Sequence, residues 1–293
     1  MRMRREPGIQ IKTAAQLAAM AEAGDVVARA LAAAAGAVAP GASTAELDAV
    51  AAREIRAAGA SPSFLGYHGF PATICTCVND EVVHGIPSPA RRLRDGDVVS
   101  IDCGAIVGGW HADAAVTVPV GTLTPELAAL LAACEQALWQ GLAAAQVGAR
   151  VGDISAAVER SARSAGGYGI VEDYVGHGIG SEMHMDPAVP NQGRPGRGPV
   201  LAEGMALAVE PLLVLGRAGT RLLDDGWTVV TADGAPAAHF EHTVAITATG
   251  PRVLTAADGG RAGFAALAGI AAQPAAAGRT WPARTAEENA HGQ

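Results

Sequence analysis

The chain has 293 residues, of which 49% are hydrophobic and 17% charged, and its 21 basic and 29 acidic residues leave a formal net charge of −8. This composition indicates a globular protein with a large core, and it disfavours nucleic acid as a partner, because phosphate binding needs clustered positive charge. No apolar run reaches the roughly 18 residues that suggest a membrane span, and no signal peptide is expected, so we predict a cytoplasmic protein without membrane contact. The cysteines show no disulfide framework, which fits a reducing compartment, and Cys77, Cys103 and Cys134 are expected in the core.

Hydrophobic periodicity and turn residues predict the elements in chain order. Apolar residues at helical spacing, bounded by cap residues, glycine or proline, predict helices over 13–35, 44–58, 124–145 and 152–165. Runs rich in Val, Ile and Thr predict strands over 72–78, 97–103, 111–118, 205–214, 227–231 and 239–247. Helices combined with antiparallel hairpins indicate an α+β fold. We expect one domain over 1–255 and a largely disordered tail of Ala, Gly and Arg over 256–293.

An internal repeat divides the chain into two related halves. Residues 93–102 align without gaps on residues 201–210, so that a leucine, an acid, a glycine and a final acid coincide. Residues 41–59 resemble 148–166, and 113–118 resemble 241–246. Each half therefore has helices, a strand that ends in an acid and a later strand that begins with one, which predicts two pseudo-symmetric halves.

The repeat selects four acids. Asp102 ends one strand, and Asp113 opens the next; if the glycines between them form the turn, Asp113 lies diagonal to Asp102 on one sheet face, about 7–8 Å away. A lone acid near a turn usually faces water, but the repeat places Glu210 and Glu241 at the matching positions on apolar strands, where an unpaired charge is costly. Because Lys12 is the single lysine of the chain, metal cations are the simplest counter-charge.

Three histidines can add nitrogen ligands. His177 lies among glycines in residues 176–180, His184 follows seven residues later, and His84 precedes a glycine. A lone histidine in a glycine-rich loop is more often structural than a ligand, but the acids and histidines support one another. Carboxylates with one or two imidazoles favour two divalent ions such as Mn, Fe, Co or Zn, and such a pair suits hydrolysis because it lowers the pKa of water.

Five motifs in this order resemble the type I methionine aminopeptidases, which belong to peptidase family M24 and have the pita-bread fold. The resemblance covers residues 10–250 and rests on GYHGFP at 66–71, NDEVVHGIP at 79–87, SIDCG at 100–104 followed by Asp113, GHGIG at 176–180 followed by His184, and Glu210-Pro followed by FEH at 240–242. It implies a metalloexopeptidase that removes the initiator methionine from nascent proteins when the second residue is small.

The resemblance also implies roles for individual residues. The metal ligands would be Asp102, Asp113, His177, Glu210 and Glu241, with Asp113 and Glu241 bridging two divalent ions. Glu210 would also shuttle a proton, His84 would lie near the substrate's amino group and scissile amide, and His184 would donate a hydrogen bond to the carbonyl oxygen. The methionine pocket would consist of Phe64, Tyr67, Phe70, Cys75, Met183 and Trp227, for each of which ordinary core packing is the alternative. The backbone carbonyl of Asn79 is a candidate ligand of a monovalent cation.

Two other readings remain open at this point. One is another pita-bread hydrolase, such as a proline-specific peptidase, although those usually carry a large N-terminal domain. The other is a binding module without metals, which the presence of all five ligand residues disfavours. A monomer is the family-based expectation for the oligomeric state, and an enzyme that acts on emerging chains would work close to the ribosome.

Overall fold

The computed structural model describes residues 8–271. Its helices are α1 (Ala14–Gly36), α2 (Thr44–Ala57), η1 (Tyr67–Gly69, a 3-10 turn), α3 (Pro125–Ala144), α4 (Val151–Ala165) and α5 (Arg261–Ala271). The strands of the first half are β1 (Ser61–Pro62), β2 (Ile74–Val78), β3 (Glu81–Val83), β4 (Val98–Val107) and β5 (Trp110–Pro119). Those of the second half are β6 (Gly169–Ile170), β7 (Gly176–Gly178), β8 (Met185–Val189), β9 (Ala206–Val209), β10 (Leu212–Val214), β11 (Thr220–Leu222), β12 (Val229–Thr231), β13 (Ala237–His239), β14 (Glu241–Thr247) and β15 (Gly250–Val253).

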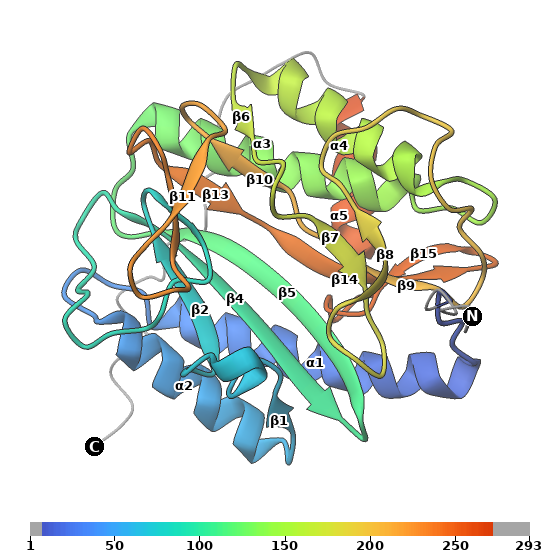
Figure 1. The fold of residues 1–293 in the computed structure, drawn as a ribbon, viewed down its shortest axis with the longest axis horizontal. Helices are drawn as coiled ribbons and strands as arrows, with labels where there is room; N and C mark the ends of the chain where they lie inside the picture. The colour runs from blue at the N-terminus through green and yellow to red at the C-terminus, as the bar shows by residue number, and fades with distance from the viewer. Residues whose placement is uncertain (1–7, 272–293) are drawn as a thin grey trace, which may run out of the picture.

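A central antiparallel sheet carries the pseudo-symmetry. Within the described residues it has nine strands, ordered β1-β4-β5-β14-β9-β7-β8, with β2 also pairing with β4 and β15 with β14. Two three-stranded sheets, β13-β10-β6 and β11-β12-β3, complete the strands. The β4–β5 pair of the first half lies beside the β14–β9 pair of the second, so β5 and β14 meet at the junction of the halves (Figure 1). This order confirms the two related halves that the internal repeat predicts.

Local capping explains why the helices begin where the sequence predicts. The Thr13 and Ser43 side chains each accept a hydrogen bond from the backbone N–H three residues later, in Gln16 and Glu46. The side chains of Gln16 and Glu46 in turn accept a hydrogen bond from the backbone N–H of Thr13 and Ser43, which completes a capping box at each helix. Thr124 caps α3, whose first residue is Pro125. At α4 the Asp153 carboxylate accepts from the Arg150 N–H. These caps satisfy backbone donors that would otherwise have no partner.

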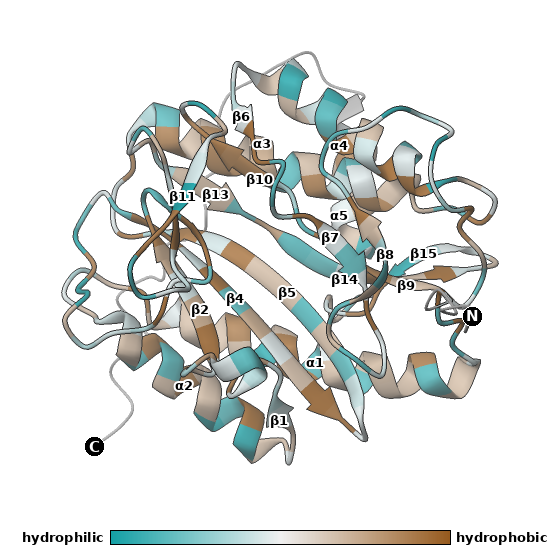
Figure 2. Cartoon of the chain, viewed as in Figure 1, coloured by the Kyte–Doolittle hydropathy of each residue, from teal (hydrophilic) through white to brown (hydrophobic). Residues whose placement is uncertain are grey.

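Each half has its own hydrophobic core between its helix pair and the sheet. Val99, Ile101 and Cys103 of β4 are buried in one cluster with Val27 of α1. Because side chains alternate across a strand, the intervening Asp102 lies on the face away from these helices. The second core gathers residues of α3, α4, β9 and β14 in the same way. Figure 2 shows hydrophobic stretches on β2 and β10 and a hydrophilic stretch on β14.

Helix α3 is long and apolar enough to cross a membrane by length and composition alone, and it is the one such helix among residues 8–271. Core helices pass the same test, and Leu130, Cys134 and Leu138 of α3 are buried in the second core. The structure therefore gives α3 a packing role. The cytoplasmic location stays a prediction.

Two expected strands are each interrupted and form two shorter strands. The stretch predicted over 205–214 divides into β9 and β10 at Glu210 and Pro211, because proline has no N–H to donate and β10 continues in a different sheet. The stretch predicted over 239–247 divides into β13 and β14 at Phe240. Both interruptions lie beside predicted site residues.

The structure differs from the prediction at the start of the expected tail. Residues 261–271, within the segment expected to be largely disordered, form α5, and the Asp258 carboxylate accepts hydrogen bonds from the Gly260 and Ala262 N–H groups at its start. Phe264 packs edge-on against Trp139 of α3 with ring centroids 5.4 Å apart. The Asp258 cap and the contact between Phe264 and Trp139 thus order a segment for which the composition predicted no helix or strand. Residues 272–293 lie outside the described residues, and the domain boundary at 255 stays a prediction.

Candidate active site

Strand register places three of the predicted ligands on one face of the sheet. Ala115 of β5 pairs with Asp102 of β4 on one side and with Glu241 of β14 on the other. Asp113 lies two residues before Ala115, so it is diagonal to both acids and shares their face. Gly108 and Gly109 form the turn between β4 and β5, with φ of 56° and 82°. The diagonal arrangement expected for Asp102 and Asp113 is therefore confirmed.

The second half supplies the two remaining predicted ligands to the same face. His242 pairs with Val209, so Glu241 stands opposite Glu210, just past the end of β9. His177 of β7 pairs with Ala208, which is two residues from Glu210 and therefore on the same face of β9. The five residues thus come from four neighbouring strands and the interruption after β9.

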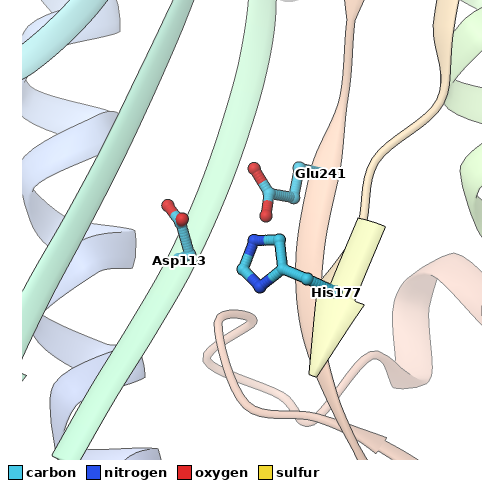
Figure 3. A group of neighbouring side chains, drawn as sticks. All are labelled: Asp113, His177 and Glu241. Atoms are coloured by element: carbon cyan, nitrogen blue, oxygen red, sulfur yellow. The ribbon is translucent and has the colours of Figure 1, made fainter. Parts of the chain in front are cut away.

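The side chains converge as well as the backbones. One ligand atom from each of Asp113, His177 and Glu241 lies within 4.8 Å of the other two, and Figure 3 shows these side chains pointing into one space. His177 Nδ1 lies 3.0 Å from the Gly178 carbonyl oxygen, which only accepts, so Nδ1 carries the proton. The lone pair is then on Nε2, which lies 3.6 Å from Glu210 Oε1. The imidazole therefore presents a free nitrogen to the acids.

Without cations, the four acids would repel one another. Burial raises the pKa of Asp113 to about 7. Burial, followed by the charge of Asp113, raises the pKa of Glu210 to about 8. Burial and neighbouring carboxylates raise the pKa of Asp102 and of Glu241 well above the ordinary range. All four shifts have the direction expected for carboxylates that need a positive partner.

Unpaired polar atoms show that the site fits divalent cations. Asp102 Oδ1, Asp113 Oδ1 and Glu241 Oε1 are buried without a hydrogen-bond partner. Among the residues that line the surrounding cavity in the described part of the chain there is no lysine or arginine. Oxygen donors with an imidazole are the ligands that Mn, Fe, Co and Zn accept, so these residues fit such ions.

A cavity of about 280 Å³ opens beside the acids. One wall is an apolar cluster in which Phe64, Phe70, Cys75 and Met183 are buried and Trp227 packs against them, with the Phe70 and Trp227 rings 5.1 Å apart. The six predicted pocket residues all line the cavity, together with the five predicted ligands, His84 and His184. An apolar compartment thus adjoins a cluster of carboxylates, which suits a ligand with a hydrophobic side chain next to a polar group.

The two further histidines are held differently. His84 has a left-handed backbone with φ of 59°, uncommon outside glycine, and its ring lies edge-on to Tyr174 and Trp227. The next residue, Gly85, donates to Cys77 Sγ at 3.3 Å, which holds the loop on β2. His184 is exposed at the rim, where its Nδ1 lies 2.9 Å from the Tyr67 hydroxyl.

One histidine of this cavity, His239, was not predicted from the sequence. His239 is 2% exposed and lines the cavity, and burial lowers the pKa of its imidazole to about 3. Its position in the sequence could have indicated it: His239 precedes Glu241 by two residues, and side chains two residues apart on a strand share a face. Asp173, Tyr174, Val175 and Val83 also line the cavity and were not predicted.

The fold and the site define a metallopeptidase, and comparison with known proteins supplies its family. The model of metallopeptidase family M24 matches residues 18–248, and the chain belongs to that family. The chain is 54% identical over 259 residues to methionine aminopeptidase 1 of Mycobacterium tuberculosis, covering 87% of this chain and 97% of that protein. It is 46% identical over 244 residues to methionine aminopeptidase 1 of Bacillus subtilis, covering 83% and 98%.

Solved structures agree with the pita-bread assignment. The crystal structure of methionine aminopeptidase from Thermotoga maritima matches with a TM-score of 0.83 and 39% identity, covering 85% of this chain and 99% of that one. Prolidase from Pyrococcus furiosus matches with a TM-score of 0.67 and 23% identity, covering 84% of this chain and 65% of that one. The second likeness shows the shared fold alone.

Proposed function

We propose that this M24 chain is a methionine aminopeptidase, which hydrolyses the peptide bond that follows an N-terminal methionine. One observation carries the proposal: a cavity with an apolar wall adjoins four carboxylates, and Asp102, Asp113 and Glu241 each have one buried oxygen without a hydrogen-bond partner. The wall suits the side chain of the first residue, and the carboxylates suit cations that activate water. The methionine aminopeptidases of Mycobacterium tuberculosis and Bacillus subtilis match nearly their full length to this chain, which supports the same activity.

The proposed metal centre comprises the five convergent residues. Asp102, Asp113, His177, Glu210 and Glu241 would hold two divalent ions, with Asp113 and Glu241 between them. The central place of Asp113, diagonal to Asp102 and close to Glu241, supports the bridging role. When bound, divalent ions polarise a carbonyl group and lower the pKa of water, which is the chemistry that peptide hydrolysis needs.

Glu210 is the proposed proton carrier. Its side chain lies at the cavity just past the end of β9, with burial raising its pKa toward neutrality. A carboxylate at this position can accept a proton from the attacking water and release it to the departing amine. Glu210 lies between the end of β9 and Pro211, its carbonyl oxygen accepts a hydrogen bond from the Asn191 side chain at 3.1 Å, and it lines the cavity.

The two histidines orient the substrate. His84 lines the cavity with its ring edge-on to those of Tyr174 and Trp227, where it can contact the amino group and the scissile amide. If the Tyr67 hydroxyl donates to His184 Nδ1, His184 Nε2 carries a proton and can donate it in a hydrogen bond to the carbonyl oxygen as negative charge develops.

The apolar wall explains the preference for methionine. Phe64, Phe70, Cys75, Met183 and Trp227 offer polarisable and aromatic surfaces that suit a thioether. The cavity of about 280 Å³ takes in both this wall and the carboxylates, so it can hold the methionine side chain next to the scissile bond. A preference for a small second residue is part of the proposal. Nascent polypeptides in the cytoplasm, at or near the ribosome, are the proposed natural substrates.

A peptide assay with metal depletion and restoration tests the function. Metal-depleted protein should release no methionine from Met-Ala-Ser, and addition of Co(II), Mn(II), Fe(II) or Zn(II) should restore release with at least one of these ions. N-acetylated Met-Ala-Ser is the matched control, because it lacks the free amino group of an exopeptidase substrate. A sample that binds metal but stays inert with all four ions would contradict the proposal and favour a binding module.

A further inference from the structure

His239 occupies a position in the cavity that the proposed mechanism does not use. It ends β13 opposite Leu212 of β10, which places it beside the interrupted end of β9 and two residues before Glu241. Its side chain is 3% exposed and lines the same cavity as the acids. The residue therefore presents an imidazole to the carboxylates from the small sheet β13-β10-β6.

The outer nitrogen of this imidazole lacks a partner. His239 Nε2 is buried without a hydrogen bond, and it lies 3.9 Å from Glu210 Oε2 and 3.8 Å from Glu241 Oε2. Both distances exceed the range of a hydrogen bond. An unpaired buried nitrogen costs free energy, so a third group is needed between the imidazole and the two carboxylates.

The separations fit an ion in that gap. Two ligand atoms that each lie about 2.1 Å from one ion, at angles of roughly 110–140°, are about 3.4–3.9 Å apart. His177 Nε2, a proposed ligand, lies 3.6 Å from Glu210 Oε1, so the two imidazoles have similar spacings to the acids. His239 thus has the nitrogen, the burial and the distances of a ligand.

The backbone of His239 is fixed by side chains of the first half. Its N–H donates to Thr117 Oγ1 at 2.8 Å, and Thr117 Oγ1 donates to its carbonyl oxygen at 2.7 Å. Because the single hydroxyl proton of Thr117 is used in the bond to the His239 carbonyl oxygen, the Ser100 hydroxyl is the donor in its 2.8 Å hydrogen bond with Thr117 Oγ1. This chain holds the imidazole in place without using either ring nitrogen.

We propose that His239 is a sixth protein ligand, which binds through Nε2 the ion held by Glu210 and Glu241. The inference rests on the proposed metal centre and extends it from one imidazole to two. Nitrogen ligands favour Co(II) and Zn(II) over Mn(II), so His239 also acts on the choice of metal.

Proton NMR of the Co(II)-loaded protein counts the bound imidazoles. An imidazole bound through Nε2 keeps its proton on Nδ1, and the paramagnetic ion shifts that exchangeable signal far from the ordinary range. The wild type should show two such signals, and His239→Gln and His177→Gln should each lose one. His242→Asn is the matched control with two signals, because His242 Nδ1 is bound to Thr255 Oγ1 at 2.8 Å.

Calorimetric metal titration gives a second readout. His239→Gln should weaken one of the two Co(II) or Zn(II) affinities about 10–100-fold, with a smaller change for Mn(II). Thr117→Val keeps the imidazole but loosens its backbone, so a smaller loss of affinity is expected. Circular dichroism of each metal-free variant verifies that it folds.

The outcomes separate this inference from the proposed function. Two shifted signals in His239→Gln, or unchanged affinities, would overturn the sixth ligand. One wild-type signal that disappears in His177→Gln would also overturn it, with water as the group in the gap, and would leave the metal centre intact. No shifted signal and no metal binding in the wild type would overturn the metal centre itself and this inference with it.

Discussion

At the scale of single residues, charge is the property that sets this site apart. Four carboxylates share a small volume, and the described residues that line it include no lysine or arginine. Asp102 and Glu241 have pKa values raised by burial and by their neighbours, so neither is easily ionised alone. Bound cations would therefore favour the ionised form of the four carboxyl groups, and in metal-free protein the pH sets how many of them are ionised.

Metal-free protein should lose stability as the pH rises. Burial and then Asp113 raise the pKa of Glu210 from 4.5 to about 8, so folding favours its protonated form. This contribution is fully present below about pH 4.5 and is lost as the pH rises through about 8. Relative to Glu210→Gln, which does not titrate, chelated wild type should lose about 2 kcal/mol of unfolding free energy between pH 6 and 8. Urea unfolding at both pH values measures this, and equal pH slopes would contradict it.

Tyr67 should contribute to turnover through His184. Its hydroxyl lies 2.9 Å from His184 Nδ1, so Tyr67→Phe removes the group that orients this exposed ring. We expect kcat/KM for Met-Ala-Ser to fall roughly tenfold with unchanged metal content. Tyr168→Phe is the control, because Tyr168 packs against the second core, away from the cavity lining. A rate equal to that of the wild type would show that His184 needs no such partner.

At the scale of elements, close backbone packing holds His177 in place. A Cβ atom at Gly176 would overlap the Ala208 carbonyl oxygen, and one at Gly178 would overlap the Asp186 carbonyl oxygen. Strand β7 can therefore lie between β8 and β9 only because glycines flank its histidine. The glycines on either side of His177 are thus a packing requirement of β7.

Gly178→Ala should displace β7 and weaken metal binding. The new methyl group meets backbone atoms of β8, which cannot move aside as a flexible side chain could. We expect destabilisation of about 1–3 kcal/mol, as for other overpacked sites, and a loss of Co(II) affinity. Urea unfolding and calorimetry measure the two effects. Gly167→Ala is the control, since nothing lies within 4 Å of its added Cβ; similar behaviour of both variants would refute the close-packing explanation.

At the scale of the whole molecule, the site joins two halves that have separate cores. Asp102 and Asp113 come from the first half, and His177, Glu210 and Glu241 from the second. Protein contacts already span the junction: Thr243 Oγ1 donates to the Asp113 carbonyl oxygen at 2.8 Å and accepts from its N–H at 3.0 Å. An ion that binds Asp113 and Glu241 would add a further link across it.

Metal should therefore stabilise the whole chain. At a free ion concentration about 100 times Kd, binding to the folded state alone adds about 2.7 kcal/mol. Thermal unfolding with and without Co(II) should show this gain in the wild type, whereas Asp113→Asn should lose most of it. Glu22→Gln, which alters an exposed acid on α1, should retain the full gain. A gain of equal size in Asp113→Asn would exclude Asp113 as a ligand.

The helices and the first hairpin could be predicted because their signals are local. Thr13, Ser43 and Thr124 cap helices within a residue of the expected starts, and two glycines fix the turn that brings Asp113 diagonal to Asp102. Short pairings such as β7 with β8 and β9 went unpredicted, because strands of three to five residues depend on neighbours distant in sequence.

The sequence by itself determined the two-half plan, the acids related by the repeat and the resemblance that selects the five candidate ligands. Only the tertiary structure decided that His239 reaches the acids, that Glu210 stands past the end of a strand, and that residues 261–271 form a helix. The physical reason is range: capping, turns and periodicity act over a few residues. The surroundings of His239, by contrast, depend on Glu210 and on Thr117, which lie far apart in sequence and in different halves of the chain.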